Sequence, residues 1–211
     1  FKVVYRRHTN FSIESIQQTI EGDQNTGGGK GEVKVFRSGD LIHKIYVTSS
    51  TSGITAGDDI VQKVVLQIGD DIVDTQEKEW NQIWSELTTP ESKALGFKNM
   101  TGSISNNLSK TGTLGVDMVQ VPLHFWFCRN PGLALPIIAL QYNEVKLLFT
   151  WGSSVGTSAE CKVFVDYVYL DTDERRRFSQ VSHEYLIEQI QRQPANSNGT
   201  INLDFNHPIK E

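Results

Sequence analysis

The pattern in this sequence that points most directly to catalysis is Gly152–Gly156, which matches the G-x-S-x-G motif of serine hydrolases. In those enzymes the nucleophilic serine lies on a sharp turn between a strand and a helix. A strand pattern precedes the motif here, but the residues after Gly156 lead into a second strand pattern. The sequence therefore favours a flexible connection between strands, and catalysis by Ser154 is only the third hypothesis.

Histidine and cysteine residues are present, but their spacing does not fit a zinc site. His183 and Glu184 begin like the H-E-x-x-H motif of zinc proteases, yet Ile187 occupies the place of the second histidine. His124 and Cys128 are four positions apart in a predicted strand, which separates them by about 13 Å. Zinc holds its ligands at about 2 Å, so these two side chains are too far apart to share an ion.

Two further patterns concern calcium and phosphate. The pairs Asp58-Asp59 and Asp70-Asp71 flank one predicted strand, which at its full length holds them about 30 Å apart. The loop Gly27–Gly31 resembles a phosphate-binding loop, but Gly31 stands where that motif requires serine or threonine. The sequence therefore predicts neither a metal nor a cofactor.

Composition limits the class of protein further. With 211 residues and a hydrophobic fraction of 38%, the chain is long enough for one domain spanning residues 1–211. Its net charge of −5 argues against direct binding to nucleic acid. The apolar stretches Phe125–Cys128 and Leu133–Leu140 are shorter than the roughly 20 residues of a membrane-spanning helix. Cys128 and Cys161 are interpreted as free thiols in a reducing compartment, and the start at Phe1 without a secretion signal predicts a trimmed N-terminus.

Alternation of apolar and polar residues dominates the chain and is typical of β-strands. It is clearest in Val145–Trp151 and Cys161–Tyr169, and the Gly/Ser/Thr-rich stretch Gly152–Glu160 between them predicts a hairpin connection. The further predicted strands are Phe1–Tyr5, Phe11–Ile20, Glu32–Phe36, Leu41–Thr48, Ile60–Ile68, Val119–Phe127, Glu184–Gln191 and Thr200–Phe205. The protein is therefore expected to be all-β and antiparallel.

Helical spacing is much rarer. Apolar residues three and four positions apart, Trp80, Ile83, Trp84 and Leu87, predict one helix, with Asp74 and Glu77 as its capping residues. A second, shorter helix is predicted over Thr172–Gln180, where acidic residues come first and arginines follow. Many short strands with few helices indicate a sandwich of two sheets.

The segment Val121–Pro136 is unusual because its aromatic residues are too continuous for a strand with one face in water. Such a run either passes through the core between two sheets or packs against a neighbouring subunit. Because the chain also lacks a convincing catalytic arrangement, this segment favours a role in packing and assembly.

Five stretches of this sequence resemble the major capsid proteins of the nucleocytoplasmic large DNA viruses. They are spread over the whole chain, and the last two are close to the most characteristic stretches of that family. The stretches are Phe1–Phe11, Ser38–His43, Ile68–Asp74, Leu123–Tyr142 and Asp166–Gln191.

The resemblance implies an eight-stranded antiparallel jelly-roll sandwich with one or two short helices in its loops. It further implies that residues 1–211 are the first of two tandem jelly rolls, that three chains form a pseudo-hexagonal capsomer, and that capsomers tile an icosahedral shell. The partners would be other copies of the chain and minor capsid proteins, and the location would be the virion, after synthesis in the cytoplasm of the infected cell. The loops Glu21–Gly31 and Gly96–Gly115 are candidates for contacts between capsomers. Asn143 departs from the family pattern, which has histidine there.

One alternative from another class is a carbohydrate-binding β-sandwich, which presents exposed aromatic residues on one face. Exposure of Trp126 and Trp151 would favour that alternative, whereas burial of both would remove its main support. Glycosylation sequons form a separate group of candidate sites, and they lie at Asn10, Asn99, Asn107 and Asn198.

Overall fold

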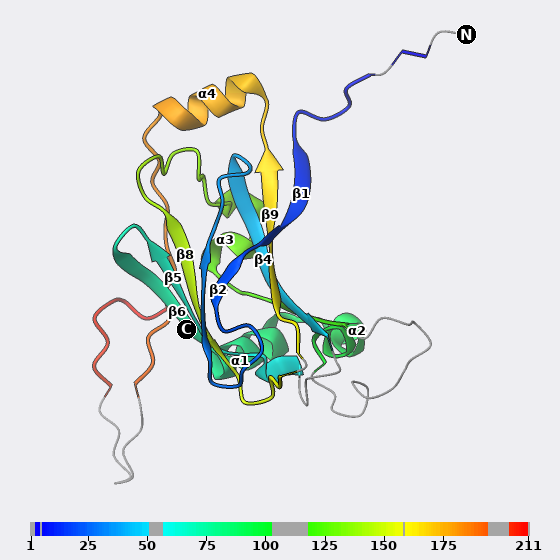
Figure 1. Cartoon of the computed structure of the whole chain (residues 1–211). Coiled ribbons are helices and arrows are strands. Elements are labelled where there is room, and N and C mark those ends of the chain that lie inside the picture. Colours follow the sequence, from blue (N-terminus) through cyan, green and yellow to red (C-terminus); the bar gives the residue numbers. More distant parts are fainter. Residues whose placement is uncertain are drawn as a thin grey trace.

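Two antiparallel sheets form the body of the protein in the computed structural model (Figure 1). The structure describes residues 3–4, 6–50, 57–102, 118–157, 159–193 and 203–210. The four-stranded sheet has the order β1 (Ser12–Gln18), β9 (Lys162–Tyr169), β4 (Leu41–Ser50) and β7 (Met118–Pro122). The five-stranded sheet has the order β2 (Ile20–Gly22), β3 (Lys30–Lys34), β8 (Val145–Trp151), β5 (Val61–Ile68) and β6 (Asp71–Glu77).

The strand order is that of a jelly roll, as the resemblance implied, but the described residues contain nine strands where eight were expected. The extra strand comes from the predicted strand Phe11–Ile20, which the structure divides at Thr19. Residues before Thr19 pair with β9 in one sheet, and β2 pairs with β3 in the other. One continuous stretch of chain therefore crosses between the sheets and closes one side of the sandwich.

The core lies between the two sheets and is built by the alternation seen in the sequence. In β8, Val145, Leu147, Phe149 and Trp151 are all buried, while the residues between them are half-buried. In β9, the buried positions are Val163, Val165 and Tyr167, which belong to the facing sheet. Fully burying one such side chain stabilises the fold by about 1.5–3 kcal/mol. The two predicted central strands are thus confirmed.

The connection between these two strands is not the predicted hairpin. β8 pairs with β3 and β5, whereas β9 pairs with β1 and β4, so Gly152–Glu160 passes from one sheet to the other. Strands that are adjacent in sequence do not have to pair when the connection is long enough to span the roughly 10 Å between packed sheets. The prediction of strands was right here, and the prediction of their pairing was wrong.

At the C-terminal side, one predicted strand is wrong and another is only partly covered by the described residues. The described residues of Glu184–Gln191 form no strand, although they follow an extended course. Thr200–Phe205 lies partly outside the described residues, and its described part forms no strand. The same holds for Phe1–Tyr5 at the N-terminal side, of which only Val3 and Val4 are described.

Four α-helices are present in the described ranges, two more than expected. The predicted helices are confirmed as α1 (Lys78–Thr88) and α4 (Thr172–Gln180). The unpredicted ones are α2 (Glu91–Thr101), which starts after Pro90, and the short α3 (Trp126–Arg129). The latter replaces the end of the predicted strand Val119–Phe127, because the aromatic run has no alternation that would maintain a strand.

The predicted capping of α1 is wrong. Glu77 is its N-cap residue but makes no side-chain capping hydrogen bond, and Asp74 belongs to β6. The Asp74 carboxylate accepts hydrogen bonds from the backbone N–H of Thr75 and from the Gln76 amide. The Asp74 carboxylate is therefore bonded within β6 and does not cap the helix.

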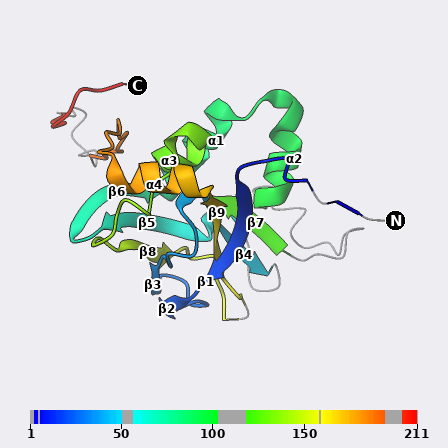
Figure 2. The same cartoon turned by 90° about the horizontal axis from the view of Figure 1, so that it is seen from above.

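The helices lie in distinct places around the sandwich. α1 and α3 lie on the side where the edge strands β6 and β7 are found, opposite the β1–β2 crossing (Figure 2). Figure 1 shows α4 at one end of the sheets and α1 and α2 at the other. None of the helices in the described ranges has the length and apolar character that a membrane crossing requires.

Candidate assembly surfaces

Ser154, the candidate nucleophile, lies in a turn that is fixed by Asp59. Its backbone N–H donates to the Asp59 carboxylate at 3.0 Å, and the Ser153 hydroxyl donates to the same oxygen at 3.0 Å. Among the described residues that follow, up to the end of β9, no helix supplies the strand-to-helix elbow. The Gly-Ser motif therefore forms a connection between sheets.

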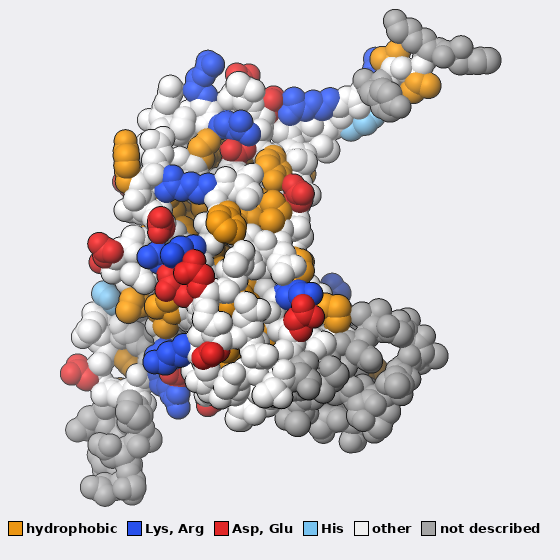
Figure 3. Space-filling model, viewed as in Figure 1, with side chains coloured by type: hydrophobic (Ala, Val, Ile, Leu, Met, Phe, Trp, Pro, Cys, Tyr) orange, Lys and Arg blue, Asp and Glu red, His pale blue; other side chains and the backbone are white. Residues whose placement is uncertain are grey.

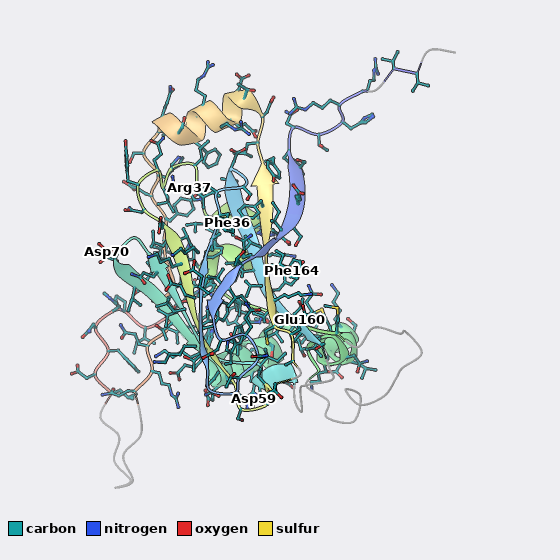
Figure 4. All side chains as sticks on the ribbon, in the orientation of Figure 1. Phe36, Arg37, Asp59, Asp70, Glu160 and Phe164 are labelled. Carbon is teal, nitrogen blue, oxygen red and sulfur yellow. The ribbon has the colours of Figure 1, made fainter. Side chains whose placement is uncertain are left out.

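Asp59 is also the ion-pair partner of α1, through Lys78 at 2.7 Å. Burial raises the pKa of Asp59, but hydrogen bonds from Lys78, Ser153 and Ser154 outweigh that effect and hold the pKa below its ordinary value. Figure 4 labels Asp59 and Asp70 at different ends of the five-stranded sheet, so the two acidic turns do not meet. Within the described ranges, no group of three or more metal-ligating side chains is close enough to hold an ion.

His124 and Cys128 lie near the short helix α3, in environments that suppress charge. Burial, followed by the nearby Arg129, lowers the pKa of His124 to about 4. Burial raises the pKa of the Cys128 thiol to about 12, which keeps it protonated and unreactive at neutral pH. His183, the other sequence candidate, bonds through Nε2 to the Phe178 carbonyl at 2.8 Å. The surroundings of His124, Cys128 and His183 therefore favour a role in packing over a role in catalysis or metal binding.

Both tryptophans that decide the carbohydrate-binding alternative are buried. Trp126 is 2% exposed and Trp151 is 1% exposed. The Trp151 indole donates to the Asp23 carbonyl at 2.6 Å, which ties the β2–β3 loop to the end of β8. The aromatic run around Trp126 contributes to the core, so the first of its two predicted roles is confirmed. The main support for a carbohydrate site is removed.

Exposed apolar side chains remain on α1. None of its residues is buried, and Ile83 and Leu87, two of the apolar residues whose spacing predicted the helix, are 54% and 74% exposed. Trp84 is covered by the Arg129 guanidinium, 3.9 Å from the ring centre. The helix is amphipathic, yet its apolar face is only partly covered by the rest of the described chain. Uncovered apolar faces of this kind mark contacts with other proteins.

A second apolar area lies over the edge of the four-stranded sheet. Phe11 and Ile13 at the start of β1 are more than half exposed, and Ile13 pairs with Val168 in β9. On the same sheet, the rings of Tyr46 and Phe164 stack with their centres 5.4 Å apart. Figure 3 shows hydrophobic side chains on the face over β1 and β9, and Figure 4 labels Phe164 there. The free edge of β1 is therefore flanked by apolar side chains.

The basic cluster Arg175–Arg177 lies on α4, as predicted, and one of its members makes a specific contact. Arg175 pairs with Asp40 at 3.0 Å, and Asp40 is largely buried. Arg7 pairs in turn with Asp171, the N-cap residue of α4. The arginines thus fasten the helix to the end of the sandwich.

The comparisons with known proteins agree with this geometry. A family model described as the N-terminus of the major capsid protein matches residues 1–171. The chain belongs to the major capsid protein family. A major capsid protein of Pyramimonas orientalis virus is 47% identical over the whole chain, and one of Paramecium bursaria Chlorella virus 1 is 41% identical. The chain covers 58% and 54% of those two proteins, a little over half their length.

A solved structure leads to the same family. The PBCV-1 virus capsid, a quasi-atomic model, matches 99% of this chain and 56% of its own chain, with 38% sequence identity and a TM-score of 0.77. The identity is high enough to support the family as well as the jelly-roll fold. The sequence resemblance to viral major capsid proteins is thus confirmed.

The predicted glycosylation sites differ in their surroundings. Asn10 is exposed and precedes β1, whereas Asn99 is exposed on α2 and the Thr101 of its sequon is buried. Asn107 and Asn198 lie outside the described residues, as does most of the predicted contact loop Gly96–Gly115.

Proposed function

We propose that this chain is a building block of a viral capsid shell and acts by binding copies of itself, with no reaction performed. The observation that carries the proposal is the close match of its jelly roll to a solved capsid over 99% of the chain. The uncovered apolar side chains on α1 and along β1 support it, because they offer surfaces for neighbouring copies. The closed sandwich supplies a rigid body on which those surfaces are fixed.

The finer assembly is part of the same proposal. Three copies would form a pseudo-hexagonal capsomer, capsomers would contact each other and minor capsid proteins, and residues 1–211 would be the first of two tandem jelly rolls. The length of the relatives supports the tandem arrangement, because each is nearly twice as long as this chain. The β2–β3 loop within Glu21–Gly31 would contribute to contacts between capsomers. Many modest, identical contacts can together hold a shell.

The test is the mass of the purified chain in solution, measured by sedimentation equilibrium over a hundredfold range of concentration. We expect a species of three times 23.7 kDa to grow as the concentration rises. A mass of 23.7 kDa at every concentration would contradict self-sufficient assembly of this chain. A matched variant with Ile83→Glu and Leu87→Glu on α1 tests whether that apolar face contributes, and β1 is left unchanged in it.

If the protein carries an N-linked glycan, we propose Asn10 as its site. Asn10 is exposed in a bend where the chain is accessible, whereas the Thr101 hydroxyl of the Asn99 sequon donates within α2 to the Phe97 carbonyl at 3.0 Å. Peptide mass spectrometry of virion protein, with and without glycosidase treatment, tests the assignment. A glycan on Asn99 and none on Asn10 would contradict it.

A further inference from the structure

An extended segment without regular secondary structure, residues 182–193, lies beside the edge strand β6 and is called the strap below. The Gln189 side chain donates to the Val73 carbonyl at 2.6 Å. The backbone N–H of Ile190 donates to the Asp74 carboxylate at 3.1 Å. The strap thus occupies the edge of the five-stranded sheet, but each of these bonds has a side chain at one end.

Ion pairs add to the docking of the strap. Glu188 pairs with Arg129, which also donates to the His124 carbonyl and lies over the Trp84 ring. Arg192 pairs with Glu77 at the end of β6. Arg129 is therefore the point at which the strap meets α1 and the short helix α3.

The strap covers one side of a surface groove. The body contributes Trp80 and Ile83 of α1 together with Lys63 and Thr75 of the sheet, and the strap contributes residues 190–193. Other apolar side chains of the strap face outward, since Leu186 is 84% exposed and Ile187 is 41% exposed. The strap is therefore held by polar contacts and few apolar ones.

Release of the strap does not require the jelly roll to unfold. Both sheets are complete without it, and no backbone ladder joins it to β6. The strap begins directly after Val181, the C-cap residue of α4, and that helix has no buried residue. Segments with few buried apolar contacts open locally at a small fraction of the cost of global unfolding.

We propose that neighbouring copies of this chain exchange their straps, so that the strap of one copy seats on β6 and Arg129 of the next. The partner is a second copy because β6 and Arg129 already hold this segment within one chain, and each of those contacts can be made identically between two chains. Exchange of an identical element links protomers at low energetic cost. The proposal rests on self-association of the chain and names the segment that achieves it.

Residues 203–210 are expected to move with the strap. Lys210 pairs with Glu188, and the Asp204 backbone N–H donates to the Gln193 side chain at 2.9 Å. The exchanged unit therefore includes this returning segment, whose described contacts with the strap stay intact.

Cross-chain disulfide formation tests the exchange. One preparation carries Val73→Cys and another carries Gln189→Cys, and the two are mixed at assembling concentration and oxidised; native Cys128 and Cys161 are retained. We expect a covalent heterodimer on non-reducing gels, at least tenfold more abundant than in a control that mixes Lys34→Cys with Gln189→Cys. Lys34 is exposed on β3, away from β6. A heterodimer yield equal to that of the control would overturn the exchange.

A single chain with both substitutions separates this outcome from failure of assembly. If straps exchange, oxidation of the assembled double variant links chains into covalent oligomers, and oxidation at high dilution yields closed monomers that no longer associate. If the double variant closes within each chain while the mass measurement still shows trimers, the exchange is wrong and self-association stands. Unmodified chain that remains monomeric contradicts both. Should Val73→Cys prevent folding, Glu77→Cys with Arg192→Cys tests the exchange at the other end of the strap.

Discussion

The replacement of Gly152 by alanine tests the close approach on which the connection between the two sheets depends. Gly152 follows β8 at the point where the chain leaves the five-stranded sheet, and its N–H donates to the Ile60 carbonyl at 2.9 Å. A Cβ atom at this position would lie 1.6 Å from the Asp59 carbonyl oxygen. Its backbone angles do not require glycine, because its φ is not positive. The substitution therefore measures crowding alone.

The expected loss of stability follows from the contacts that must move. Relieving the clash separates Gly152 from Asp59 by more than 1 Å, and overpacking of this kind costs about 1–3 kcal/mol. The same movement weakens the hydrogen bonds of Ser153 and Ser154 to the Asp59 carboxylate, and bonds to a charged acceptor contribute about 1.5–3 kcal/mol. We expect Gly152→Ala to lower the free energy of unfolding by about 3–5 kcal/mol.

Urea denaturation followed by tryptophan fluorescence measures this difference, since Trp151 is the neighbour of Gly152 and is buried. Gly96→Ala is the matched control, because Gly96 lies inside α2 and a Cβ there has no atom within 4 Å. In a helix interior that change is expected to stabilise by about 0.5–1 kcal/mol. A Gly152→Ala protein within 1 kcal/mol of the unmodified chain would refute the reasoning.

Two further predictions concern buried polar groups. The folded-state pKa of His124, about 4, lies below its ordinary value of 6.5, so the folded state binds fewer protons than the unfolded state between these values. The stability that His124 contributes to the folded state should therefore be fully present above about pH 6.5. The free energy of unfolding should decline by about 3 kcal/mol from this source as the pH falls to about 4. His124→Phe should remove that part of the pH dependence, as measured by urea titrations at pH 7 and pH 4. Tyr167→Phe should destabilise by about 1–3 kcal/mol in the same assay at pH 7, because the Phe36 carbonyl loses a donor at 2.6 Å; an unchanged midpoint would show that water replaces it.

Most strands of the sandwich were accessible from the sequence because burial imposes a period of two on them, but β6 was not predicted. β8 follows that period along its full length, and β9 follows it from Lys162 to Tyr167. Pairing was less accessible, since the sequence of Gly152–Glu160 is compatible with a hairpin and with a crossing between sheets. The division of the first strand at Thr19 was invisible for a related reason, because the alternation continues while the hydrogen-bonding partner changes.

The candidate surfaces could be predicted only in part. Helical spacing identified the apolar side of α1 correctly, but spacing does not reveal whether that side faces the core or solvent. The strap was predicted as the strand Glu184–Gln191, because its residues suit an extended backbone. Its course is extended, yet side chains of β6 take the place of a partner strand, as with Asp74. Whether side chains or a partner strand bond to the strap depends on tertiary neighbours, and the local sequence of the strap does not indicate them.

The covalent crossing at Thr19 makes the two sides of the sandwich mechanically unequal. At the β1–β2 side, the two sheets are joined by a continuous backbone through Thr19. On the opposite side, Gln76 of β6 accepts the His124 N–H just beyond β7 at 3.2 Å, and the covalent link between those strands is long. A force that pulls the two sheets apart should therefore separate them first at β6 and β7, while β1 and β2 stay joined.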